Sequence, residues 1–223
     1  MKIVMAVGGS ILVPDKPDME YIKRFAQFSE DLSKKHTLAL VVGGGKTARN
    51  NIKEALKKGA NNAECDYIGI DASRENARML AETMNVREDI PENFRDADRR
   101  LKTEDILIMG GTEPGHSTDA VAAILAEYIG ADLLIKITNV DGVYDKDPKK
   151  NPDAKMLDEI NVQDALKMAS SSVINPGSYA MIDLLAVKIV QRSKLNFFVV
   201  SKDLENLRAL IQEKEFKGTK VIV

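Results

Sequence analysis

The sequence predicts an α/β fold in which helices cover both faces of an open, mostly parallel sheet. Apolar, β-rich runs alternate along the chain with segments of helical period. Each run is apolar throughout rather than at every second residue, which is typical of strands buried on both faces. Clusters of glycine follow three of these runs, and the turns after the strands of such a sheet are where its ligands gather.

The strand candidates, in chain order, are Lys2–Val7, Thr37–Val42, 105–109, 132–137 and 196–200. Between them, apolar residues spaced three or four apart predict helices around 22–32, 48–56 and 204–211, the second stopping at Gly59. An apolar run at 120–129 and a helical stretch at 183–189 add two more. The β-α-β-α order predicts right-handed crossovers. The charged stretch 87–100 interleaves acidic and basic residues, so we interpret it as a solvated excursion, with a functional basic patch as the alternative.

Composition places the chain among packed, enzyme-like proteins. Its 223 residues are 44% apolar and 30% charged. Length alone allows one large domain or two small ones, but no Pro-, Ser- or Gly-rich linker divides the chain, so we expect one domain, 1–223. The formal net charge of −2 gives no broad basic field, so we expect neither nucleic acid nor a membrane surface as a partner.

Cysteine usage and the N-terminus predict a location. Cys65 is the only cysteine, which agrees with a reducing compartment and predicts a small buried residue rather than a disulfide. The N-terminus lacks a signal-peptide pattern, and no apolar run approaches the roughly 20 residues of a membrane helix. We therefore expect a cytoplasmic protein.

The turn 43–47, Gly-Gly-Gly-Lys-Thr, follows the second strand candidate and opens a helix. A P-loop would need a glycine five residues before Gly45, and that position is Leu40, so the Walker motif is excluded. Unpaired N–H groups at such a helix start favour an anion, and Arg49 one turn later can donate a charge-assisted hydrogen bond to phosphate. The alternative is a tight turn with a surface arginine.

Two further glycine turns follow strand candidates. The first, 8–10, ends in Ser10, which offers a hydroxyl group and an N–H donor. The second, 110–119, leads into an apolar helix that its serine, threonine or aspartate could simply cap. Asp119 would be costly among phosphate-binding turns unless it orders a cation or a basic side chain. His116 is a possible general base, but an acceptor phosphate is already an anionic nucleophile, so we favour acceptor binding or loop structure for it.

The loop 138–148 after the fourth strand candidate holds small polar groups and Tyr144. A tyrosine that stacks on a base, with acceptors nearby, suits adenine and ribose, and a β-turn at Asp141-Gly142 is the structural alternative. Lys188 lies in a helical stretch with an otherwise apolar face, where it either extends to solvent or points at phosphate.

Taken in order, these segments resemble the amino acid kinase superfamily and, within it, the archaeal-type uridylate (UMP) kinases, over nearly the whole chain. The most specific stretches are VVGGGK at 41–46, DYIGI at 66–70, MGGT at 109–112 with PGH at 114–116, and TNVDGVY at 138–144. The resemblance implies the amino acid kinase fold, a three-layer αβα sandwich with a mostly parallel central sheet. Its N-terminal part would bind mainly the acceptor and its C-terminal part mainly ATP.

The resemblance also implies an activity. The chain would transfer phosphate from ATP directly to UMP, giving UDP for pyrimidine nucleotide synthesis without a covalent intermediate, as a cytoplasmic homohexamer. Mg²⁺ would accompany ATP by bridging its phosphates, with no metal site built from protein side chains. A kinase of another small phosphate such as isopentenyl phosphate, whose prenyl tail would need an apolar tunnel, is one alternative. A nucleotide-binding module without turnover is another.

Residue by residue, the resemblance assigns three groups. The catalytic residues are Asp119, Lys188 and Arg49. The residues that would bind the ATP phosphates are Gly9, Ser10, Gly45 and Arg49. Those that would bind adenosine are Thr138, Asn139, Tyr144 and Asp147. The residues that would bind UMP are Gly44, Asp66, Gly111, Thr112, Glu113, Pro114, Gly115, His116, Ser117 and Thr118.

The chain departs from the superfamily pattern in two places. Many members carry a lysine two residues before the first glycine pair, where this chain has Ala6, and the archaeal-type kinases also tend to lack it. Without that lysine, Lys188 and Arg49 become stronger candidates for the catalytic positive charge. The same departure motivates the non-catalytic alternative. The other is the stretch 175–181 before Lys188, whose length the resemblance does not align.

Overall fold

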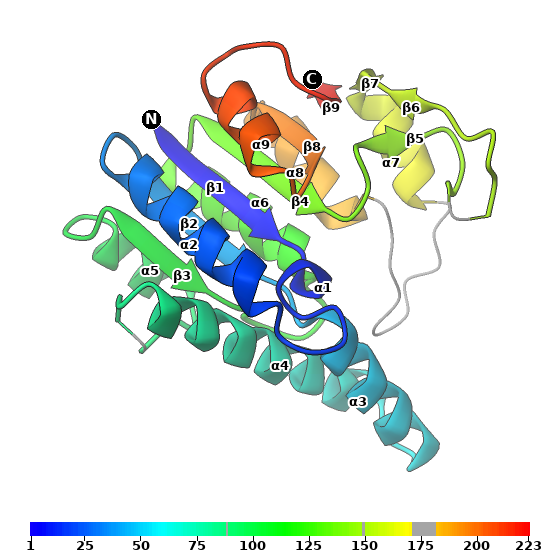
Figure 1. Ribbon diagram of the computed structural model, residues 1–223. Helices are drawn as coiled ribbons and strands as arrows, with labels where there is room; N and C mark the ends of the chain where they lie inside the picture. Colours follow the sequence, from blue (N-terminus) through cyan, green and yellow to red (C-terminus); the bar gives the residue numbers. More distant parts are fainter. Residues whose placement is uncertain (88, 149, 171–181) are drawn as a thin grey trace.

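The computed structural model describes residues 1–87, 89–148, 150–170 and 182–223. The middle of its sheet consists of five parallel strands, in the spatial order β3 (Ile106–Met109), β2 (Thr37–Val42), β1 (Lys2–Val7), β4 (Leu133–Thr138) and β8 (Phe197–Ser201). The sheet continues with β9 (Gly218–Ile222), antiparallel to β8, and β7 (Glu159–Asn161), parallel to β9 (Figure 1). The α/β class and the mostly parallel sheet are confirmed, and all five predicted strands are present to within one residue at either end.

Nine helices are described along the chain. They are α1 (Gly9–Leu12), α2 (Met19–Ser33), α3 (Gly45–Lys57), α4 (Asn62–Thr83), α5 (Phe94–Arg100), α6 (Thr118–Ile129), α7 (Val162–Ser170), α8 (Leu184–Ser193) and α9 (Leu204–Ile211). The predicted helices correspond to α2, α3, α6, α8 and α9. As predicted, α3 ends just before Gly59, which has φ +89°.

The sheet separates two apolar cores, because successive side chains of a strand point to opposite faces. In β1, Ile3 and Met5 pack with Phe25 of α2, and the same core takes in α4 and α9. Val4 and Ala6 point the other way, into a core shared with α5, α6, α7 and α8. The result is the three-layer arrangement of Figure 1, with the sheet between two helical layers.

The longest helix, α4, has 22 residues and was missed by the sequence analysis. Its start is well specified by a capping box, in which Asn61 and Glu64 each bond the other's backbone N–H. Its buried face, however, carries Ser73 and Asn76 among apolar residues such as Cys65, and these polar residues break the apolar stripe. Figure 1 shows the N-terminal half of α4 extending with α3 beyond the sheet.

The region after β4 was also under-predicted. A short antiparallel hairpin of β5 (Val143–Tyr144) and β6 (Met156–Leu157) precedes β7, and β9, near the C-terminus, lies between β8 and the edge strand β7. These strands have two to five residues, so their sequences carry too little periodicity to be recognised.

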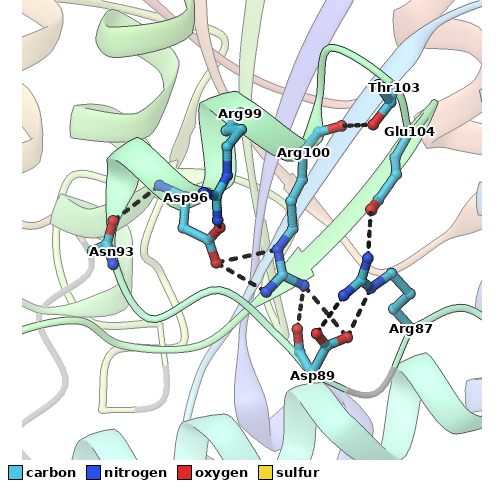
Figure 2. A network of polar contacts seen from close by, with 8 residues as sticks. All are labelled: Arg87, Asp89, Asn93, Asp96, Arg99, Arg100, Thr103 and Glu104. Atoms are coloured by element: carbon cyan, nitrogen blue, oxygen red, sulfur yellow. Dashed lines mark hydrogen bonds and ion pairs between the residues drawn. The ribbon is translucent and has the colours of Figure 1, made fainter.

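The charged excursion is held by ion pairs between its own residues (Figure 2). Arg100, whose side chain is 15% exposed, pairs with Asp96 within α5 at 2.9 Å and with Asp89 in the preceding loop at 3.6 Å. Arg87 bonds the same Asp89 through two nitrogens, at 2.8 Å and 2.5 Å. This interleaving of charges supports the solvated interpretation rather than a basic patch. Within the described residues, no helix is both long and apolar enough to span a membrane.

Candidate functional site

The site lies where the strand order of the sheet reverses. From β1 the chain builds outward through β2 and β3, then returns to β4 on the other side of β1. Open parallel sheets bind ligands at such a switch point, outside the carboxyl ends of the strands. The segment after β1 is joined there to the end of β4 and the loop that follows it, because Gly8 N–H donates to Ile137 O (3.2 Å) and Asn139 Nδ2 donates to Ser10 Oγ (3.0 Å). Ser10 and Asn139, both predicted to bind ATP, therefore lie side by side.

The first glycine loop (residues 8–10) and the second glycine loop (43–45) touch backbone to backbone. A Cβ on Gly9 would lie 2.2 Å from Gly43 O and 2.3 Å from Gly45 N, so no larger residue fits. Gly45 also has φ +68°, a left-handed conformation that favours glycine. The structure thus brings together Gly9 and Gly45, the two glycines predicted to bind the ATP phosphates.

Gly44 and Arg49 flank the start of α3. Gly44 is its N-cap, and a Cβ there would lie 3.0 Å from Gly69 O of α4. Arg49, in the second turn, is partly buried, and the described residues record no hydrogen bond or ion pair for its guanidinium. That group therefore remains able to bind an anion.

The acceptor loop (residues 110–118) is held against α4. Gly115 N–H donates to Asp66 Oδ2 over 2.8 Å, which joins two positions predicted to bind UMP. Ser117 is the N-cap of α6 and accepts a hydrogen bond from Ala120 N–H (3.1 Å), so the capping role is confirmed for this hydroxyl. The other predicted members of the loop differ in exposure: Gly111 is buried, Pro114 and Thr118 are partly buried, and Glu113 is exposed.

Two polar atoms of the acceptor loop are buried without a hydrogen-bond partner in the described part of the chain. They are Thr112 Oγ1 and His116 Nδ1. Leaving such an atom unpaired costs about 1–3 kcal/mol, and native proteins keep few of them. Two on one loop point to a ligand with polar groups, in agreement with the predicted contact of both residues with the acceptor.

Asp119, predicted to be the central carboxylate, pairs with Lys136. Asp119 is in the first turn of α6, and its Oδ2 contacts the Nζ of Lys136 from β4. The lysine side chain is 6% exposed and the aspartate side chain 24%. A basic partner for Asp119 was expected, but Lys136 was not named. Its signal was a single lysine within an otherwise apolar strand, Leu-Leu-Ile-Lys-Ile-Thr.

The partner of Lys136 across the sheet is Ala6. The two residues lie opposite each other in the parallel register of β1 and β4. Both side chains point toward the α6 layer, because Val4 and Leu134, two residues earlier in each strand, lie in that core. A methyl group at residue 6 leaves space for the long side chain of Lys136.

The predicted adenosine-binding residues lie along the chain from the end of β4 onward. Thr138, the last residue of β4, is buried, Tyr144 in β5 is partly buried, and Asp147 is exposed. The start of this segment is tied to the C-terminal part of the chain by an ion pair between Lys217 and Asp141 (2.7 Å), which raises the pKa of Lys217.

Thr219 fixes the β5–β6 hairpin and was missed by the sequence analysis. Its Oγ1 accepts from Val143 N–H (2.7 Å) and donates to Leu157 O (2.5 Å). A Cβ on Gly142 would lie 2.5 Å from the same oxygen. No local sequence signal identifies this threonine, since its partners lie more than sixty residues away in the chain.

Lys188, predicted to be catalytic, lies in α8 on an exposed position between buried Val187 and Ile189. The described residues record no contact between Lys188 and Asp119. The stretch 175–181 that precedes this helix lies outside the described residues.

Comparison with known proteins decides the family. The model described as the amino acid kinase family matches residues 1–201. The chain belongs to this family. It is 46% identical to the uridylate kinase of Thermococcus onnurineus and 45% identical to that of Thermococcus kodakarensis, in both cases over 99% of each chain. The crystal structure of uridylate kinase from Archaeoglobus fulgidus superposes with a TM-score of 0.88 at 40% identity, covering 99% of this chain and 100% of that one.

Proposed function

We propose that this chain is a UMP kinase. It transfers the γ-phosphoryl group of ATP to a phosphate oxygen of UMP, giving UDP and ADP for pyrimidine nucleotide synthesis. The observation that carries the proposal is the similarity, over 99% of both chains and at 45–46% identity, to proteins named uridylate kinase. The geometry agrees with it, since the two glycine loops and the acceptor loop follow β1, β2 and β3, and the acceptor loop leads into α6, where Asp119 pairs with the buried Lys136.

The chain acts in this proposal as one domain, 1–223. Gly9 and Ser10 of the first glycine loop and Gly45 of the second bind the ATP phosphates, with Arg49 adding positive charge. Gly44 of the second loop faces UMP, and the segment from the end of β4 onward holds adenosine. Asp66 and the acceptor loop bind UMP mainly through the N-terminal part of the chain, where Thr112 Oγ1 and His116 Nδ1 meet polar groups of the acceptor. This arrangement gives the two buried polar atoms the partners that they lack among the described residues.

Catalysis follows from alignment and charge. An oxygen of the UMP phosphate attacks the γ-phosphorus as the bond from that phosphorus to the β–γ bridging oxygen breaks, and ADP leaves. The acceptor is already an anion, so no general base is required, and no covalent intermediate forms. Asp119 orients the buried ammonium of Lys136 at the centre of the site, and Lys188 and Arg49 supply further positive charge to the transferring group.

In this proposal Mg²⁺ accompanies ATP and is held mainly by the nucleotide. Among the described residues, no group of three histidine, cysteine, aspartate or glutamate side chains could hold a metal ion, and the central carboxylate already pairs with Lys136. Mg²⁺ that accompanies ATP would supply positive charge to the phosphates in this proposal.

An assay of ADP release across several acceptors tests this function. UMP, CMP, dUMP, isopentenyl phosphate and N-acetylglutamate are compared at equal concentration with ATP and Mg²⁺. We expect kcat/KM to be highest for UMP. Equal or greater turnover of isopentenyl phosphate or N-acetylglutamate, or ATP and UMP binding without ADP release, would refute the proposal.

Assembly as a homohexamer and a cytoplasmic location belong to the same proposal. Both rest on the likeness to the archaeal-type uridylate kinases. Light scattering coupled to size-exclusion chromatography gives the molar mass directly, and a mass of one chain, 24.6 kDa, would contradict the hexamer.

A further inference from the structure

One turn of α4 contacts both sides of the proposed site. Ser73 Oγ accepts from Gly111 N–H over 2.7 Å, and Arg74 Nε donates to Gly111 O over 3.1 Å. Two residues further on, Asn76 Nδ2 donates to Gly43 O over 2.9 Å. Ser73 is 1% exposed and Asn76 8%, so these hydrogen bonds form in the interior. Polar side chains on the buried face of α4 thus form hydrogen bonds with the backbone of loops outside the helix.

The bond from Asn76 fixes the two glycine loops, which carry the predicted ATP-phosphate glycines Gly9 and Gly45. It holds the carbonyl of Gly43, and the same carbonyl oxygen is the atom closest to the Cβ position of Gly9, at 2.2 Å. Because no side chain or space separates them, a shift of the Gly43 carbonyl displaces the first glycine loop as well. Asn76 therefore determines the position of both glycine loops without reaching the nucleotide itself.

The bonds from Ser73 and Arg74 fix the acceptor loop. Between them they bond both the N–H and the carbonyl of Gly111, and Arg74 Nη2 also lies 3.4 Å from Thr112 O. A Cβ on Gly110 would lie 2.7 Å from Arg74 N, so the loop approaches the helix backbone directly. The outer end of Arg74 pairs with Glu92 at 2.9 Å.

We infer that Asn76, Ser73 and Arg74 are positioning residues that set the distance between the ATP phosphates and the acceptor phosphate. The inference rests on the proposed function. Ser73 and Asn76 are three residues apart, a rise of about 4.5 Å along a helix, and a packed helix keeps that spacing rigidly. In-line phosphoryl transfer depends on such a fixed separation, since a misplacement of about 1 Å can cost about 100-fold in rate.

The test separates the two sides of the site. Kinetic constants for ATP and UMP are measured for Asn76→Ala and Ser73→Ala, and dissociation constants for UMP and a non-hydrolysable ATP analogue are measured by calorimetry. We expect Asn76→Ala to raise the KM and Kd for ATP by about tenfold and to change those for UMP less than about twofold. Ser73→Ala should do the opposite. Both should lower kcat.

Conservative variants keep the test decisive if an alanine variant folds poorly. Asn76→Asp keeps the shape but turns the donor into an oxygen facing Gly43 O, so it should weaken ATP binding more than Asn76→Ala does. Arg74→Lys keeps the charge opposite Glu92 but loses the planar fork, so UMP binding should weaken. Glu92→Gln is the matched control: it removes the ion pair while leaving the bonds of Arg74 to the loop, and both KM values should stay within about twofold of wild type.

The outcomes distinguish this inference from the proposed function. If the wild-type protein does not phosphorylate UMP, the proposed function fails. If it does, and the Asn76 and Ser73 variants change the ATP and UMP constants together or not at all, the positioning role is wrong and α4 has only a structural role. If Asn76→Ala changes mainly the ATP constants and Ser73→Ala mainly the UMP constants, and both variants have circular dichroism spectra like that of wild type, the positioning role is supported.

Discussion

Removing either member of the Asp119–Lys136 pair should destabilise the protein more than removing both. The lysine side chain is 6% exposed, so its ammonium is almost fully desolvated, whereas the aspartate is 24% exposed and keeps some contact with water. Breaking a buried pair from one side costs about 3–5 kcal/mol. Asp119→Asn should approach the lower end of that range, about 3 kcal/mol, because it leaves the buried ammonium without this carboxylate.

Lys136→Met should cost less, about 1–2 kcal/mol, because the remaining carboxylate is partly hydrated. The methionine stem fits beside Ala6 in a core that is otherwise apolar. The double variant, Asp119→Asn with Lys136→Met, should lie within about 1 kcal/mol of wild type, since replacing both charges is often neutral. If the double variant costs between zero and about 1 kcal/mol, the cycle has a coupling energy of about 3–5 kcal/mol.

Urea unfolding followed by far-ultraviolet circular dichroism measures these differences. Turnover gives an independent readout, because Asp119→Asn should lower kcat by on the order of 10² or more, and the stable double variant should not recover it. If the loss of unfolding free energy in the double variant equals the sum of the losses in the two single variants, the two charges do not stabilise each other. Wild-type turnover in Asp119→Asn would show that this carboxylate has no central role in catalysis.

Three further predictions follow from single contacts. Gly9→Ala places a Cβ 2.2 Å from Gly43 O and should abolish detectable ATP binding, whereas Gly69→Ala, whose Cβ meets only a side-chain carbon at 3.6 Å, should leave ATP binding intact in the same calorimetric titration. Thr219→Val leaves Val143 N–H without its acceptor, so it should cost about 1–3 kcal/mol in urea unfolding; an unchanged midpoint would show that Thr219 does not hold the hairpin. Arg87 holds the pKa of Asp89 at about 2, below its usual 3.8. The pair stabilises the folded protein while Asp89 is ionised; this effect is present above the unfolded-state pKa of 3.8 and is lost as pH falls through about 2. The stability difference between wild type and Asp89→Asn should therefore shrink as pH falls from about 4 to about 2, and a difference independent of pH would contradict the pairing.

The elements that sequence analysis recovered are those whose signal is local. Each of the five parallel strands is an almost continuous apolar run, because both of its faces are covered. The glycine loops were recognisable for a similar reason. Glycine occurs where backbones touch, as at Gly9, or where φ is positive, as at Gly45, and both needs are visible in the residue type alone.

The features that were missed depend on partners far away in the chain. Asn76 and Gly43 are 33 residues apart, and Thr219 and Val143 are 76 apart. A buried serine or asparagine in a helix weakens the apolar stripe that predicts the helix, and only the folded structure shows which carbonyl or N–H it binds. The residues that position the loops of this site are therefore the same residues that concealed α4 from the sequence analysis.

Lys136 also weakens the argument that this chain is a nucleotide-binding module without turnover. That hypothesis was motivated by Ala6, where many members of the superfamily carry a lysine. Residues 6 and 136 are neighbours in register on the same face of the sheet, so a lysine on either strand extends along that face toward Asp119 at the start of α6. Ala6 therefore does not leave the central carboxylate without a cation; it provides the space in which the lysine of the adjacent strand reaches it. The absence of a lysine at residue 6 is then no argument against turnover.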